Sequence, residues 1–332
     1  EFENKVVFDD RFTAIAIDSL QLNYKQEQIA FAGVIRDSTY KNLKIRFKDV
    51  NIGNIIPPVD SLQLYGRTNG SLSFLYENGA YFPTSNVSID DIVINKIGFG
   101  DLTLDIDGNQ DLTKYRISSS LTNKDVRSFN ALGTIDFAPK TSQLDLDLRL
   151  NEFNLEALNP FGANVITDIR GEASGALQVM GNYKSPKILG IINLKNSGLK
   201  VPYLNTDFDI ANSTQMIVSD ETLSIIATGI TDTKFNTKGI FSGIATHDNY
   251  RGWNLNLQIE APKRLLVLDT PPDDDELYYG TSFISGNAEI KGPIEALDIK
   301  VFAATQEGTT FKIPLSDTES IGDDSFIKFL SP

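Results

Sequence analysis

Apolar and polar residues alternate along most of the chain. Residues 43–47 read LKIRF, residues 144–150 read LDLDLRL and residues 253–259 read WNLNLQI. Successive side chains of a β-strand point to opposite faces of the sheet, so this period of two predicts strands with one apolar and one polar face. Turn sequences such as Asp107-Gly108 and Ser197-Gly198 separate these stretches at hairpin spacing. We therefore expect antiparallel strands that run up and down, with almost no helix.

Two short stretches break the alternation. They are residues 51–58 (NIGNIIPP) and residues 154–162 (NLEALNPFG). The second is predicted to form one or two helical turns that end at Pro160, because proline interrupts a helix. Both stretches lie between predicted strands.

A glycine pattern recurs after these stretches and indicates internal repeats. Residues 66–70 read GRTNG, residues 171–175 read GEASG, and residues 280–286 (GTSFISG) form a looser third copy. The copies lie about 105 to 111 residues apart, which leaves room for several hairpins in each unit. We expect residues 1–332 to form one continuous β-segment of a longer protein, with approximate repeat units 1–150, 151–262 and 263–332, the last of them truncated.

A sheet with one apolar face must bury that face against another layer. The candidates are a sandwich of two sheets, a closed barrel, or an open trough whose lining is covered by something other than protein. Glycines inside alternating strands mark bulges and bends, and they favour the trough. Pro83, Pro202 and Pro314 follow the three glycine copies and are interpreted as marking its rim.

The predicted fold is all-β: an elongated, repeat-built antiparallel sheet curled into an open groove, a β-taco or trough with an apolar lining. We predict the lining by taking the apolar residues of each stretch in which apolar and polar residues alternate. The predicted residues are Leu43, Ile45, Phe47, Leu72, Phe74, Leu102, Leu104, Ile106, Leu144, Leu146, Leu148, Leu177, Val179, Leu189, Ile191, Leu223, Ile225, Trp253, Leu255, Leu257, Ile259, Leu297, Ile299 and Val301.

Composition removes several classes of function. The chain has no cysteine and one histidine, so disulfides, thiolate zinc sites and multi-histidine metal sites are excluded, and we expect no cofactor and no metal. His247, in the sequence IATHDNYRG, is predicted to be a loop residue. The net charge of -14 argues against nucleic acid as a partner, because binding to phosphates requires lysine and arginine.

Paired carboxylates such as Asp105 with Asp107 and Asp145 with Asp147 could approach the separations used by glycosidases. They lie on the polar phase of the strands and are interpreted as part of the solvated face. The acidic stretch 269–277 (DTPPDDDEL) lacks the residue order of a calcium loop and is interpreted as a turn. We therefore expect no enzyme, and a carbohydrate-active enzyme is the least favoured alternative.

Longer segments resemble a known family. Residues 171–210, GEASGALQVMGNYKSPKILGIINLKNSGLKVPYLNTDFDI, resemble the C-terminal region of the TamB family, the translocation and assembly module proteins related to AsmA-like proteins. Residues 265–329 are similar to the next portion of that family, and residues 70–95 look like a diverged earlier unit.

The resemblance implies a periplasmic protein of the bacterial envelope, tethered to the inner membrane by an N-terminal helix outside this sequence. It implies an apolar groove that carries phospholipid between the inner and outer membranes, or that assists outer-membrane protein assembly and secretion. The implied partners are phospholipid acyl chains and an outer-membrane TamA-like assembly protein, the latter contacted through parts outside this sequence. The alternative is a structural or adhesive β-sandwich array that binds a partner through its loops.

Overall fold

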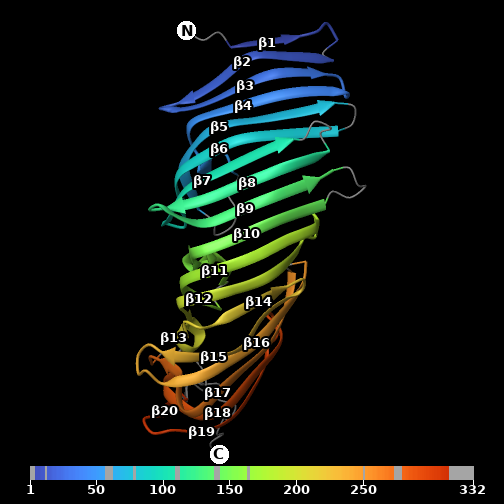
Figure 1. Ribbon diagram of the computed structural model, residues 1–332. Helices are drawn as coiled ribbons and strands as arrows, with labels where there is room; N and C mark the ends of the chain where they lie inside the picture. Colours follow the sequence, from blue (N-terminus) through green and yellow to red (C-terminus); the bar gives the residue numbers. More distant parts are fainter. Residues whose placement is uncertain are drawn as a thin grey trace, which may run out of the picture.

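A single antiparallel sheet makes up almost all of the protein. The computed structural model describes residues 4–11, 13–56, 63–77, 80–108, 113–137, 143–162, 165–249, 251–272 and 279–313. In this part of the chain, twenty strands belong to one sheet, and three short 3-10 segments lie between strands (Figure 1). This arrangement confirms the predicted all-β, elongated antiparallel sheet.

Strand neighbours in space are mostly neighbours in sequence. The chain forms a series of hairpins from β1 to β12, and the sheet divides at two places: β12 pairs with both β13 and β14, and β18 pairs with both β19 and β20. The elements are β1 (Lys5–Phe8), β2 (Ala14–Tyr24), β3 (Glu27–Arg36), β4 (Tyr40–Asn51), η1 (Ile52–Asn54), β5 (Leu64–Glu77), β6 (Ala80–Ile94), β7 (Ile97–Gly108), β8 (Lys114–Asn123), β9 (Val126–Asp136), β10 (Gln143–Asn154), η2 (Leu155–Gly162), β11 (Thr167–Asn182), β12 (Lys187–Val201), η3 (Pro202–Leu204), β13 (Thr206–Ile210), β14 (Gln215–Ser219), β15 (Thr222–Asp232), β16 (Lys238–Asp248), β17 (Arg251–Thr270), β18 (Tyr279–Pro293), β19 (Asp298–Thr305) and β20 (Thr310–Lys312).

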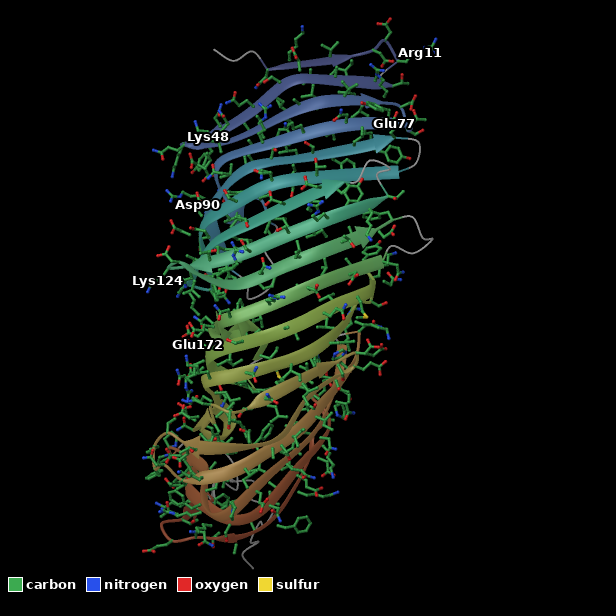
Figure 2. The ribbon with its side chains drawn as sticks, in the orientation of Figure 1. Arg11, Lys48, Glu77, Asp90, Lys124 and Glu172 are labelled. Carbon is green, nitrogen blue, oxygen red and sulfur yellow. The ribbon has the colours of Figure 1, made fainter. Side chains whose placement is uncertain are left out.

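The strands bend where β-bulges interrupt the ladders. Register shifts occur between Phe47 and Val50 in β4, between Ile89 and Ile92 in β6, and between Leu150 and Phe153 in β10. A bulge adds an unpaired residue to one strand and bends that strand. Figure 2 labels Lys48, Asp90 and Glu172, which lie at or beside such bulges, along one edge of the view.

The bulged backbone is held by side chains from the neighbouring chain segment. Asp49, Asp91, Glu152 and Asn196 have positive φ angles of 52°, 52°, 51° and 50°. Their backbone N–H groups donate to Asn69 Oδ1 (2.9 Å), Asp101 Oδ1 (2.9 Å), Ser174 Oγ (2.9 Å) and Asn212 Oδ1 (2.6 Å), respectively. A left-handed backbone is unfavourable for residues other than glycine, and the same kind of stabilising contact is present at all four of these positions.

Two local predictions were wrong. His247 was predicted in a loop, but it lies near the end of β16, is buried, and meets the Trp253 ring at a centroid distance of 4.6 Å. The two rings meet edge to face, so the indole covers part of the imidazole of this polar residue. The three prolines do not mark one rim, because Pro83 lies inside β6 whereas Pro202 begins η3, and Pro314 lies outside the described residues.

The extended sheet predicts a large radius of gyration. Its successive strands, spaced about 4.8 Å apart, give a slab about 80 Å long and about 40 Å wide, with a radius of gyration of about 26 Å. A compact chain of 332 residues would give about 20 Å. Small-angle X-ray scattering measures this quantity directly, and a value near 20 Å would contradict the open sheet.

A close backbone approach makes Gly133 sensitive to substitution. A Cβ atom there would lie 2.0 Å from the Asp145 carbonyl oxygen and 2.6 Å from the Leu146 Cα atom, both in the neighbouring strand β10. We expect Gly133→Ala to lower the midpoint of thermal unfolding by about 5 °C, because the β9–β10 ladder must shift. Gly98→Ala is the matched control, since a Cβ at Gly98 meets nothing within 4 Å. Equal midpoints for the two variants, measured by circular dichroism, would refute the expectation.

Candidate functional site

An unbroken row of uncharged side chains crosses the sheet along its long axis. Directly opposed residues of antiparallel strands share a face, so the row can be followed from one pair to the next. It runs through Leu22, Ile29, Phe47, Gly70, Val87, Leu104, Ser119, Ala131, Leu148, Leu177, Gly190, Val218, Leu223, Ala245, Leu255 and Gly292. At about 4.8 Å per strand, the row extends over about 70 Å.

We call the face that carries this row the apolar face. Neighbouring rows on it contain further predicted residues: Ile45 opposes Leu72, and Leu146 opposes Val179. On the last strands, Ile290 opposes both Leu257 and Ile299. The strand pairing places the predicted lining residues on this one face, with the exception of Leu189 and Ile191. Trp253 and Leu297 are assigned to it because each lies two residues before a paired residue of the face, Leu255 and Ile299.

Leu189 and Ile191 lie on the other face of the sheet. Leu189 opposes Gln178 and Ile191 opposes Ala176, whereas Gly190 between them opposes Leu177. Their inclusion with the other residues was wrong, and the cause is local. In the sequence ILGII at 188–192, every residue is apolar or glycine, so the alternation does not distinguish the two faces. Only the pairing with β11 determines which of these residues lie on the apolar face. Ile188 and Ile192 occupy the apolar face instead.

The opposite face, the polar face, has a different composition. One of its rows runs through Gln21, Ala30, Arg46, Ser71, Asn86, Asp105, Ser118, Leu132, Asp147, Gln178 and Leu189. Asp105 accepts a hydrogen bond from Asn86 Nδ2 at 2.6 Å, while Asp145 and Asp147 are exposed. The paired carboxylates therefore belong to the hydrated face, and in the described part of the chain no cluster of acidic residues and histidine could hold a metal ion.

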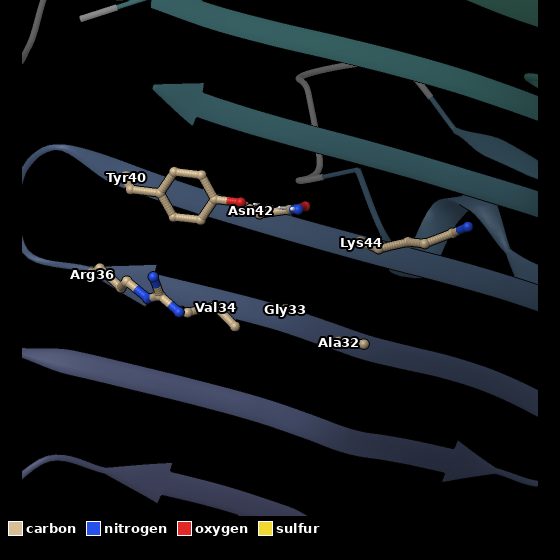
Figure 3. A pocket seen from close by; sticks show the side chains of 7 residues that line it. All are labelled: Ala32, Gly33, Val34, Arg36, Tyr40, Asn42 and Lys44. Carbon is tan, nitrogen blue, oxygen red and sulfur yellow. Dashed lines mark hydrogen bonds between the residues drawn. The ribbon is translucent and has the colours of Figure 1, made fainter. Parts of the chain in front are cut away.

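A shallow hollow of about 240 Å³ lies on the polar face between β3 and β4 (Figure 3). Arg36, Tyr40, Asn42 and Lys44 line it together with small residues, and the Arg36 guanidinium lies 6.0 Å from the Tyr40 ring centroid. Charged and amide groups of this kind suit water rather than an apolar ligand. The hollow is therefore separate from the apolar face.

The apolar face has little protein cover. Most of its side chains are only half-buried, and Leu72 and Phe74 retain 37% of their accessible surface. The chain as a whole exposes 21775 Å², against about 13,500 Å² for a compact protein of 36.6 kDa. The chain therefore exposes more surface to solvent than a compact fold of the same mass, as an open sheet does.

Full burial is concentrated near the bends. There Leu155 of η2 packs with Ala173, Ile192 and Leu194 in one cluster, and a second cluster joins Ile89 to Leu121 and further apolar residues. Burial also affects Tyr115, which lies on the apolar face opposite Ile135. It is fully buried, and desolvation raises its pKa to about 12, so the phenol stays neutral at physiological pH.

Comparison with known proteins gives one match. Residues 227–332 match the family model described as the TamB C-terminal domain. No curated protein and no solved structure matches the chain. Among the described residues, no helix has both the length and the hydropathy needed to cross a membrane. This match includes residues 265–329, where the sequence resembles the same family, and it identifies residues 227–332 as a TamB C-terminal domain.

Proposed function

We propose that the apolar face is a lipid-binding surface on which phospholipid acyl chains move between the inner and outer membranes. The observation that carries the proposal is the row from Leu22 to Gly292, which crosses sixteen strands without a charged side chain. The TamB family, whose C-terminal domain model matches residues 227–332, is a transport and assembly module of the bacterial envelope, and this supports the proposal.

The free energies involved favour a continuous surface. Moving an acyl chain from an apolar environment into water costs about 0.8 kcal/mol per methylene, or about 13 kcal/mol for a palmitoyl chain. An apolar face along the sheet would remove much of this cost at every position between the membranes. The lipid would in turn cover side chains such as Leu148 and Leu177, whose apolar face needs a second layer. The head group would stay in water, so the binding surface requires no charged site.

The proposal also specifies where the protein acts and which partners it contacts. The chain would act in the periplasm, tethered to the inner membrane by a helix outside this sequence, and a TamA-like outer-membrane protein would be contacted through other parts. Delivery of lipid or direct help to folding strands would support the assembly and secretion of outer-membrane proteins. The bends would curl the sheet into a groove around the lipid.

The alternative, an adhesive sandwich array, needs a second sheet packed over the first. All twenty strands in the described residues belong to one sheet, and its apolar side chains are half-exposed. In a sandwich the inner faces interdigitate and are fully buried. The observed exposure therefore favours the lipid surface over the sandwich.

Strand β10 offers a test in which the two faces alternate residue by residue. A photoreactive p-benzoylphenylalanine would replace Leu146 or Leu148 on the apolar face, and Asp145 or Asp147 on the polar face. After irradiation in cells with a double membrane, we expect phospholipid adducts at Leu146 and Leu148, because only these positions would touch acyl chains. Mass spectrometry of the crosslinked protein identifies the adduct.

The variants at Asp145 and Asp147 are the controls, because they carry the same photoreactive group on the same strand but on the polar face. Equal lipid labelling at all four positions would indicate nonspecific contact with membranes and would contradict the proposal. Labelling at none of them, with no phospholipid retained in native mass spectrometry of the protein purified without detergent, would also contradict it.

A further inference from the structure

The two 3-10 segments η1 and η2 begin with the same sequence pattern. Residues 51–55 read NIGNI and residues 154–158 read NLEAL, so asparagine is followed by Ile or Leu one and four positions later. In η1, Asn51 Oδ1 accepts a hydrogen bond from the Gly53 backbone N–H at 3.1 Å. In η2, Asn154 Oδ1 accepts one from the Glu156 backbone N–H at 2.9 Å. The two segments are therefore equivalent parts of neighbouring repeat units, each placed before a strand with the glycine pattern.

Both segments pack onto the apolar face. Leu155 of η2 is buried against Ala173, Ile192 and Leu194, and Ala157 packs against the cluster that contains Ile89 and Leu121. Ile52 of η1 packs against that same second cluster. Ile89, Leu121 and Ile192 belong to the apolar face by their cross-strand register. The two segments thus lie over the side of the sheet that would hold lipid.

An exposed apolar residue lies one turn after the packed one, within η2 and at the C-terminal cap of η1. In a 3-10 turn, side chains three positions apart eclipse each other, so Leu158 lies above Leu155, and Ile55, whose backbone N–H donates to the Ile52 carbonyl oxygen at 3.0 Å, lies above Ile52. Leu158 retains 41% of its accessible surface and Ile55 retains 37%. Each pair therefore makes an apolar stripe that begins on the sheet and ends in solvent beside the apolar face.

Segment η2 is fixed in this position by a polar side chain. Asn159 Oδ1 accepts a hydrogen bond from the Ile169 backbone N–H at 2.8 Å, and Asn159 Nδ2 donates to the Ile169 carbonyl oxygen at 2.9 Å. This two-point contact joins η2 to the first residues of β11. The exposed position of Leu158 is thus built into the fold and is not a consequence of a free loop.

We propose that η1 and η2 form a second wall of the lipid site, with Ile55 and Leu158 contacting the acyl chains that lie on the apolar face. This inference rests on the proposed function and names residues of the same site that the strand alternation does not reveal. An acyl chain is the occupant because both stripes are uncharged and continue directly from the apolar face. The corresponding connection before β18 lies outside the described residues.

The test uses substitutions at exposed positions, where the fold tolerates a polar side chain. The variants are Ile55→Asp, Leu158→Asp and the control Leu132→Asp, whose parent side chain is 50% exposed on the polar face. The purified whole chain is titrated with vesicles of palmitoyl phosphatidylethanolamine, and the lipid that it extracts is quantified by mass spectrometry. We expect about tenfold weaker extraction for the two wall variants and no change for the control, because an apolar contact is replaced by a charge. Unchanged circular dichroism melting curves would verify that all three variants fold.

Photocrosslinking separates failure of this inference from failure of the proposed function. With p-benzoylphenylalanine at Leu158 or at Leu146, we expect lipid adducts at both positions and none at Leu132. Adducts at Leu146 without any at Leu158, together with normal extraction by Leu158→Asp, would overturn the second wall and leave the lipid surface standing. An adduct of Leu158 with protein and never with lipid would likewise overturn it. No adduct at either Leu146 or Leu158 would overturn both proposals.

Discussion

Cross-strand register is the constraint on which the rest of the structure depends. Opposed residues share a face, so every apolar side chain in the row from Leu22 to Gly292 is placed by its pairing with the strands on either side. A shift of one residue in β10 would exchange Leu148 for Asp147 on the apolar face. The sheet is long and its strands contact mainly their paired neighbours, with β13 also touching β17, so an error of register at one strand would interrupt the row. Hydrophobic patterning and hairpin connections together keep the pairing in phase.

The sequence was most informative about which face a side chain occupies where only every second residue of a strand is apolar. In residues 144–150, leucines alternate with charged residues, and the register places these leucines together on the apolar face. In residues 188–192 both phases are apolar or glycine, so the face of Leu189 and Ile191 depended on a partner strand that sequence alone does not identify. The exposed fractions of two neighbouring side chains also differ between the faces: Ile191 retains 46% of its accessible surface, whereas Ile192 is buried.

The bends were harder to predict than the strands. Glycines inside strands indicated curvature, but Asp49, Asp91 and Glu152 adopt positive φ angles at bulges although they resemble ordinary polar residues in the sequence. Their conformation depends on hydrogen bonds to residues ten to twenty-two positions away, which no local pattern reveals. Similarly, the stretch 154–162 was predicted to form one or two helical turns ended by Pro160. It forms η2, with Pro160 inside the segment, and its packing onto the apolar face was not predicted.

Repetition gives the proposed lipid surface a property that a single pocket would lack. A deep pocket binds one acyl chain strongly and releases it slowly, since affinity differences are expressed mainly in dissociation rates. Along the row, the residues at successive strands are small or medium-sized apolar side chains such as Val87, Ala131 and Leu177, with no charged group between them. Neighbouring positions would therefore hold an acyl chain with similar free energies, and the barrier between them would be a partial exposure of a few methylenes. Such a surface would let lipid move along it, because no single position retains the chain.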